Sequence, residues 1–188
     1  MLPPRIVRRL VLAPLMLVAT GALLTTLPIW LLLAVAAAPV VPGRWRPLRL
    51  LWMLIVYMVH ESLGILRLFE LWVGSGFGAR MRSDAMRDEH YRVMTWLLSA
   101  LYRNAVRVLK LDVRIEPRGA SDDVVRALER PLLVFSRHAG PGDSFLLVHE
   151  VLVRLERRPR IVLKDLLQLD PCLDILLNRL PNHFVTPD

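Results

Sequence analysis

Cysteine and lysine are nearly absent from this sequence of 188 residues. The one thiol, Cys172, excludes an internal disulfide and a cysteine-rich metal site, so nothing in the composition requires an oxidising compartment. Of the 25 basic residues only Lys110 and Lys164 are lysines, and the others are arginines. The chain is 54% hydrophobic with a mean hydropathy of +0.42, which excludes a disordered chain and an ordinary soluble domain.

Charged residues are absent from 33 consecutive positions, residues 10–42. A helix needs about 20 apolar residues to cross a bilayer, so this run predicts a membrane segment. Because the run is longer than one crossing needs and Pro28 lies near its middle, it either tilts and kinks or turns back as a hairpin. Arginines on both flanks favour a hairpin with both ends in the cytoplasm. A cleaved signal peptide is the alternative, which the length of the run disfavours.

A second apolar stretch, residues 50–73, carries a stripe of polar side chains three and four positions apart. This spacing predicts an interfacial amphipathic helix or a second span with a polar inner face. His60 and Glu61 belong to the stripe, but adjacent helix positions point about 100° apart, so two residues on a solvated stripe are favoured over a catalytic or metal-binding pair. The stripe consists of Tyr57, His60, Glu61, Arg67 and Glu70.

Residues 1–79 are therefore predicted to form a membrane-embedded or interfacial helical region. Seven arginines against two acids make this region strongly positive, which suits the anionic surface of a membrane. Nucleic acid is not an expected partner, because the arginines flank apolar segments and show no aromatic-basic stacking pattern.

Residues 80–188 alternate between helix-like and strand-like patterns. Ser83 and Asp84 are typical of a helix start, and apolar residues at helical spacing continue to Val108. Helices are also predicted at 145–155, with His149 on the surface, and at 171–180, with Cys172 buried. Strands are predicted at 111–116, 132–135, 161–163 and 183–186. The alternation predicts an α/β sheet domain.

His138 and Asp143 directly follow the predicted strand 132–135, at the edge where ligands bind in open α/β sheets. Gly140 and Gly142 permit a tight turn that brings the carboxylate of Asp143 onto one imidazole nitrogen of His138. The other nitrogen then faces a substrate hydroxyl group as a general base. The alternative is that Asp143 only caps the following helix and His138 is an ordinary loop residue.

The stretch Pro131-Leu-Leu-Val-Phe-Ser-Arg-His138-Ala-Gly-Pro-Gly-Asp143 resembles the first motif of the glycerolipid acyltransferases, the family of 1-acyl-sn-glycerol-3-phosphate acyltransferase. In that family an apolar strand leads into His-x4-Asp. The segment Val162-Leu-Lys164-Asp-Leu166, with Pro171 and the residues up to Val185, is similar to the family's second region. An N-terminal membrane-dipping helical element is also shared. The resemblance covers residues 80–188 and implies an α/β acyltransferase domain.

The resemblance implies transfer of a fatty acyl group from acyl-CoA or acyl carrier protein to a hydroxyl group of a lysophospholipid or glycerol phosphate, as in phospholipid biosynthesis. No metal or resident cofactor is implied. His138 would be the base and Asp143 would orient it, while Lys164 would hold phosphate by charge. Arg137 replaces the family's usual Asn and would bind phosphate in a bidentate manner. The substrate-binding residues predicted are Arg137, Gly140, Gly142 and Lys164.

The family's third motif, Phe-Pro-Glu-Gly-Thr or similar, is absent. We therefore expect the sequence to be the N-terminal part of an acyltransferase, with an incomplete domain over residues 80–188 and an unpaired sheet edge. This departure leaves a second function open, an inactive membrane-associated lipid-binding remnant. For either function the sequence predicts the cytoplasmic (inner) membrane, with the catalytic part facing the cytoplasm.

Overall fold

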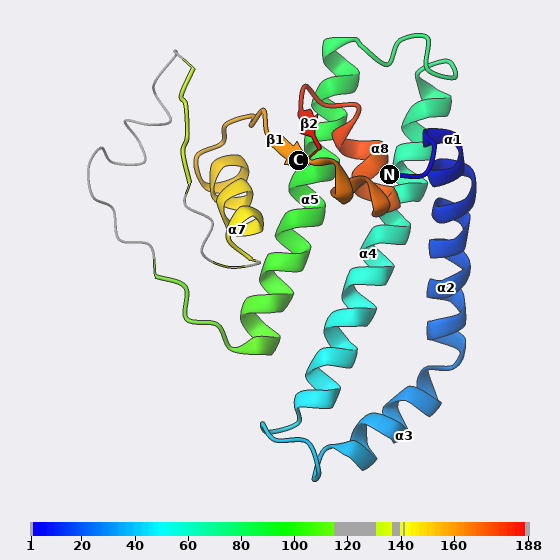
Figure 1. Cartoon of the computed structure of the whole chain (residues 1–188), viewed down its shortest axis with the longest axis vertical. Helices are drawn as coiled ribbons and strands as arrows, with labels where there is room; N and C mark the ends of the chain where they lie inside the picture. Colours follow the sequence, from blue (N-terminus) through cyan, green and yellow to red (C-terminus); the bar gives the residue numbers. More distant parts are fainter. Residues whose placement is uncertain (1, 115–130, 137–139, 141, 187–188) are drawn as a thin grey trace.

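Helices dominate the chain in the computed structural model (Figure 1), which describes residues 2–114, 131–136, 140 and 142–186. The structure is 67% helical, and the described residues contain one sheet of two short parallel strands. The α/β fold class predicted for the acyltransferase domain is therefore wrong. The described part of the chain is a mostly helical fold.

The first 74 residues form a kinked helical segment and a long returning helix. The polar start of the chain and the uncharged run contain α1 (Arg5–Val7), the π-helical η1 (Arg8–Leu12), α2 (Ala13–Thr25) and α3 (Leu27–Ala37). The returning helix is α4 (Arg46–Gly74). The stretch Arg5–Thr25 and the helix α4 are both long and apolar enough to span a membrane.

The uncharged run kinks at Thr26 and does not fold back on itself. Pro28, in the first turn of α3, has no N–H with which to continue the hydrogen bonding of α2. The hydroxyl groups of Thr25 and Thr26 donate to the carbonyl oxygen of Ala22 at 3.0 and 2.6 Å, which satisfies the end of α2. The chain reverses only after α3, and α4 then returns beside α2 (Figure 1).

The helix α5 (Asp84–Leu109) begins where the sequence predicts. The Ser83 hydroxyl oxygen accepts the N–H of Met86 at 3.3 Å, the hydrogen bond of an N-cap. The indole N–H of Trp52, near the start of α4, donates to the Asn104 side-chain oxygen at 3.3 Å, near the end of α5. The two helices are therefore antiparallel neighbours over most of their length (Figure 1).

The C-terminal part of the chain packs short elements around α5 and the end of α4. The predicted strand at 161–163, helix at 171–180 and strand at 183–186 are confirmed. The strands pair in parallel with Leu163 opposite Phe184, and α8 lies in the crossover between them. The elements are α7 (Asp143–His149), the π-helical η2 (Glu150–Arg154), β1 (Val162–Lys164), the 3-10 helix η3 (Asp165–Leu169), α8 (Pro171–Leu177) and β2 (His183–Val185).

Two other predicted strands are wrong as far as the structure describes them. Residues 111–114 and 132–135 form no strand, and the side chains of Leu133 and Phe135 are 81% and 88% exposed. A strand needs a neighbour whose backbone groups pair with its own, and the described sheet holds only β1 and β2. The segment 132–135 therefore keeps its apolar sequence without a partner strand.

The core lies where α4, α5 and α8 meet. Leu68 of α4 and Leu176 of α8 are completely buried, and Leu97 of α5 is 2% exposed. The α4–α8 contact is close, because a Cβ placed on Gly64 would lie 2.7 Å from the sulfur of Cys172. This contact holds α8 against α4. The same helix also contacts η1 and α2, and charged side chains of α8 and η1 meet there.

Candidate functional site

The predicted catalytic loop is only partly described. Arg137 and His138 lie outside the described residues, so the pairing of His138 with Asp143 stays a prediction. Gly140, Gly142 and Asp143 are described, and Asp143 is the first residue of α7.

Asp143 turns its carboxylate back over the loop instead of onto the helix. Its Oδ2 accepts the backbone N–H of Gly140 at 2.6 Å, and its own N–H donates to the Gly140 carbonyl oxygen at 3.2 Å. The N-cap residue of α7 is Gly142, where no side chain makes a capping hydrogen bond. The carboxylate therefore closes a turn on Gly140, and Asp143 is the first residue of α7 and not its N-cap residue.

The two described glycines are not required by backbone strain. Gly142 has a φ of −88°, which any residue adopts, and a Cβ placed there would meet nothing within 4 Å. A Cβ on Gly140 would lie 3.5 Å from the Asp143 Oδ1, an ordinary contact. A substrate-binding role for Gly140 and Gly142 stays a prediction.

The helix that begins with Asp143 is anchored on α5 by stacked rings. The imidazole of His149 stacks on the phenol ring of Tyr102 with centroids 4.0 Å apart. His149 is buried, so its predicted place on the helix surface is wrong. Lys164, the predicted phosphate-binding residue, ends β1 as an exposed side chain.

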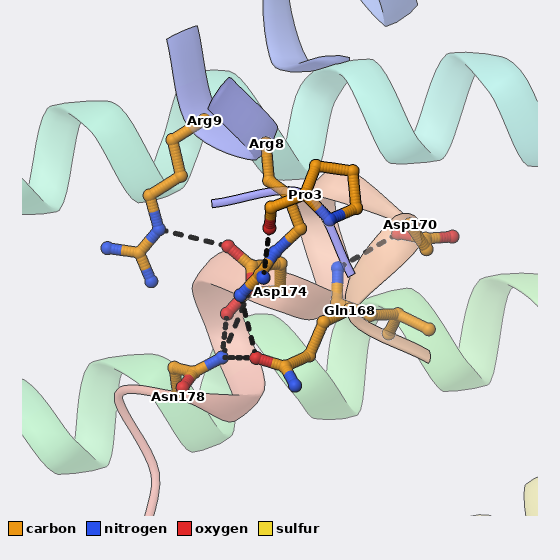
Figure 2. Close-up of polar contacts among 8 residues, drawn as sticks. Pro3, Arg8, Arg9, Gln168, Asp170, Asp174 and Asn178 are labelled. Atoms are coloured by element: carbon orange, nitrogen blue, oxygen red, sulfur yellow. Dashed lines mark hydrogen bonds and ion pairs between the residues drawn. The ribbon is translucent and has the colours of Figure 1, made fainter. Parts of the chain in front are cut away.

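A buried ion cluster joins the two ends of the described chain (Figure 2). The carboxylate of Asp174, in α8, is completely buried. Arg8 donates to its Oδ1 through Nη2 at 2.8 Å and Nε at 3.2 Å, and Arg9 donates to its Oδ2 through Nε at 3.0 Å. Asn178 and Gln168 complete the cluster, because the Asn178 amide donates to Asp174 and Gln168 accepts from Arg8. The cluster fixes the start of the N-terminal apolar helices onto α8.

Next to this cluster lies Arg179, whose positively charged side chain is partly buried against the core. Its Nη1 donates to the carbonyl oxygen of Leu68 at 2.8 Å and lies 3.3 Å from the Nε2 of His90. The His90 Nδ1 lies 2.5 Å from the Met86 carbonyl oxygen and so carries the proton, which leaves Nε2 as the acceptor. Burial, with the charges of Arg9 and Arg5, lowers the pKa of Arg179 to about 10, so it stays charged at neutral pH.

A second polar group lies between α4 and α8. The Tyr57 hydroxyl group donates to the Asp170 Oδ2 at 2.5 Å, and Asp170 caps α8 by accepting the N–H of Leu173 at 2.9 Å. Glu61 is 2% exposed, so its predicted place on a solvated stripe is wrong, because α8 covers it. Burial, followed by the neighbouring carboxyl groups of Glu61 and Asp170, raises the pKa of the Cys172 thiol. Cys172 is therefore a buried protonated thiol and no nucleophile.

Comparison of the chain with models of protein families, with curated proteins and with solved structures finds no match.

Two features of the described residues can act on a ligand. The turn at 140–143 presents a carboxylate beside a loop, which suits orientation of a basic group. The arginines near Asp174 place cations beside apolar helices, which suits an anionic amphiphile. Sequence reasoning missed this second feature, although an arginine pair at the edge of the uncharged run and a single acid within an apolar helix were its signals. Within the described residues, no group of three histidine, cysteine or acidic side chains is arranged to bind a metal.

Proposed function

We propose that this protein is a membrane-associated acyltransferase that moves a fatty acyl group from acyl-CoA or acyl carrier protein to a hydroxyl group of a lysophospholipid or glycerol phosphate. The observation that carries the proposal is the turn in which Asp143 accepts the N–H of Gly140. This turn directs a carboxylate toward the loop of the His-x4-Asp motif, as orientation of a histidine base requires.

In the proposed reaction His138 takes the proton of the acceptor hydroxyl group while its oxygen attacks the thioester carbonyl carbon. The carbon–sulfur bond then breaks, and the thiolate leaves with the proton returned by the imidazolium. A hydroxyl group has a pKa far above 7, so attack without a base in contact is slow. Asp143 would stabilise the imidazolium, and Arg137 and Lys164 would hold phosphate groups of the substrates.

The same proposal places the protein at the inner face of the cytoplasmic membrane, with the catalytic part in the cytoplasm. Large apolar side chains are exposed on all sides of α3 and along α2 and α4. Soluble monomeric proteins rarely expose so large an apolar surface to water. The helix α5 beside α4 carries exposed charges, Arg92 being an example, so this pair would lie at the interface and not cross it together. The exposed apolar residues of the N-terminal helices and α4 include Leu10, Leu15, Val18, Ile29, Leu32 and Phe69.

The membrane proposal is tested by carbonate extraction. We expect the protein to stay in the membrane pellet, because its apolar helices would be held in the bilayer by the hydrophobic effect and not by ionic contacts. Release into the supernatant, or a product trimmed near Ala38, would overturn it and support a signal peptide.

Acyl transfer is tested with labelled acyl-CoA and acyl carrier protein, each offered with lysophosphatidate or glycerol phosphate, on membranes that contain the protein. His138→Ala and Asp143→Asn should each lower the rate at least about 100-fold, the lower end of general-base catalysis. The matched controls are His183→Ala and Asp112→Asn, at exposed residues of the same types. Near-normal turnover in Asp143→Asn would refute its role as the orienting residue.

A second function is a lipid-binding protein without catalysis. The exposed, unpaired segment 132–135 favours it, because no sheet then holds the residues before His138 in a fixed place. If no labelled acyl group is transferred to any of the acceptors while the protein stays in the membrane, this second function is supported.

A further inference from the structure

A large groove lies between the N-terminal helices and α4, and the chain after α4 and the chain around the end of α8 complete it. Its volume is about 1330 Å³. Pockets for small molecules have volumes of roughly 300–1,000 Å³, so this groove has room for an extended amphiphile. The groove is lined by residues of α1, η1, α2, α4, α5 and α8 and of the segments 78–82 and 178–181, and none of the described residues of the His-x4-Asp motif lines it.

The groove has an apolar wall that is open to the side. Leu17 of α2 and Ile65, Leu66, Phe69 and Trp72 of α4 line it. Leu66 and Phe69 are 51% and 60% exposed, so the wall continues into the apolar outer surface of α4. A lipid in the surrounding bilayer would reach this wall without crossing water.

Arginines gather in the same groove. Arg5 and Arg9 come from the start of the chain, and Arg179 follows α8. These three lie close enough for the charges of Arg9 and Arg5 to lower the pKa of Arg179, after the larger effect of its burial.

The positive charge in the groove exceeds the negative charge that faces it. Five arginines line the groove, namely Arg5, Arg9, Arg82, Arg87 and Arg179, and Arg8 is paired beside it. Among the described residues, the ion pairs of these arginines are those of Asp174 with Arg8 and Arg9 and of Asp84 with Arg87. Arg179 donates to a carbonyl oxygen and a neutral imidazole, neither of which carries a charge. The Nη2 of Arg9 is buried and has no hydrogen-bond partner among the described residues. A buried, unsatisfied guanidinium nitrogen beside excess positive charge is costly, and an anion would relieve both.

We propose that this groove binds the phosphate group of an anionic phospholipid between Arg5, Arg9 and Arg179, with an acyl chain along the apolar wall of Leu17, Leu66 and Phe69. Guanidinium groups match phosphate geometry through paired N–H donors. A free phosphate or nucleotide would leave the apolar wall exposed, whereas a membrane phospholipid fills both parts of the groove. The inference goes beyond acyl transfer and does not require His138.

The test is binding of labelled dioleoyl phosphatidate and dioleoyl phosphatidylcholine to the whole chain in neutral detergent micelles. We expect one phosphatidate per chain, weakened by salt, and little phosphatidylcholine. Arg5→Gln combined with Arg179→Gln should weaken phosphatidate binding at least about tenfold, since hydrogen bonds to charged groups are the strong ones. The matched control is Arg44→Gln combined with Arg46→Gln, which removes the same charge at exposed residues before α4 and should leave binding unchanged.

Two further measurements keep the result unambiguous. Arg5→Gln alone changes an exposed residue and so tests the site even if the double variant does not fold; it should weaken binding about threefold or more. Inorganic phosphate serves as the free-anion probe and should compete only at concentrations far above those of phosphatidate. Equal binding of the two lipids, equal losses in the two double variants, unchanged binding in Arg5→Gln, or competition by phosphate at equal concentration would each overturn the proposal.

Discussion

The region around α8 and the segment 131–136 contain similar sequences that adopt different structures. Both contain short apolar stretches of the kind that forms strands, Ile161-Val-Leu163 in one and Leu132-Leu-Val-Phe135 in the other. In the α8 region the stretch pairs with β2 and lies on a core in which Leu176 and Cys172 are completely buried. In the segment 131–136 every residue is exposed. Local sequence is thus sufficient for a strand only where a helix brings the second strand to it.

The α8 region also differs from an exposed part of the chain in the burial of its ion pairs. The α8 region buries Asp174 and satisfies it with two arginines and an amide. In the segment that follows α5, by contrast, the ion pair of Arg114 with Asp112 is exposed, with side chains 80% and 70% accessible. Buried partners depend on each other far more than exposed ones, since removal of one leaves the other charged and out of water.

The largest effect is expected from breaking the buried cluster. Asp174→Ala leaves Arg8 without its counter-charge and should lower the free energy of unfolding by about 3–5 kcal/mol. The matched variant Asp112→Ala removes an exposed partner and should cost less than about 0.5 kcal/mol. Both are measured by denaturant unfolding in neutral detergent, and equal losses would show that the buried and the exposed ion pair do not differ in their contribution.

The next effect is a pH dependence that belongs to the α8 region. The pKa of Cys172 is raised in the folded state, so its stabilising contribution is complete below the unfolded thiol pKa of about 8.5 and falls as pH rises through the folded value. Between pH 8.5 and 10 stability should fall by up to about 1.4 kcal/mol per pH unit. Above pH 10 the lowered pKa of Arg179 acts in the opposite direction, since the unfolded chain then binds its proton more tightly.

Unfolding measured from pH 8.5 to 10 tests this slope, and Cys172→Ala should make it shallower, since Glu61 and Asp170 remain at the site. Iodoacetamide gives a second readout, because the folded chain should react far more slowly than the unfolded chain at pH 9. A slope that persists unchanged in Cys172→Ala would assign the effect to other groups.

Local signals in the sequence predicted the helices well. The Ser83 cap located the start of α5, and the pattern around Pro171 located α8, because capping and helical periodicity depend on neighbours in the chain. The predicted strands 111–116 and 132–135 are wrong over their described residues, 111–114 and 132–135, for the opposite reason. A strand depends on partners far away in sequence, and apolar runs alone do not say whether those partners are present.

The candidate site divides in the same way. The turn closed by the Gly140 N–H and the Asp143 carboxylate lies within four residues, whereas the predicted pairing of Asp143 with His138 stays a prediction. The pairing of Arg8 with Asp174 joins residues 166 positions apart, which no local pattern predicts. Glu61 was assigned to solvent because its helix position was known while the helix that covers it was not.

The smallest effect on the free energy of unfolding is expected from a substitution in the segment 131–136. It distinguishes this exposed segment from the buried α8 most directly. Phe135 is 88% exposed, so Phe135→Ala should change the free energy of unfolding by less than about 0.5 kcal/mol. If the segment were a buried strand as its sequence suggests, the same substitution would cost about 3–5 kcal/mol through lost burial and a cavity. Leu176→Ala in the buried α8 is the matched positive control, with an expected cost of about 2–5 kcal/mol. A loss in Phe135→Ala as large as that in Leu176→Ala would mean that residues 132–135 pack in the folded protein as a core strand.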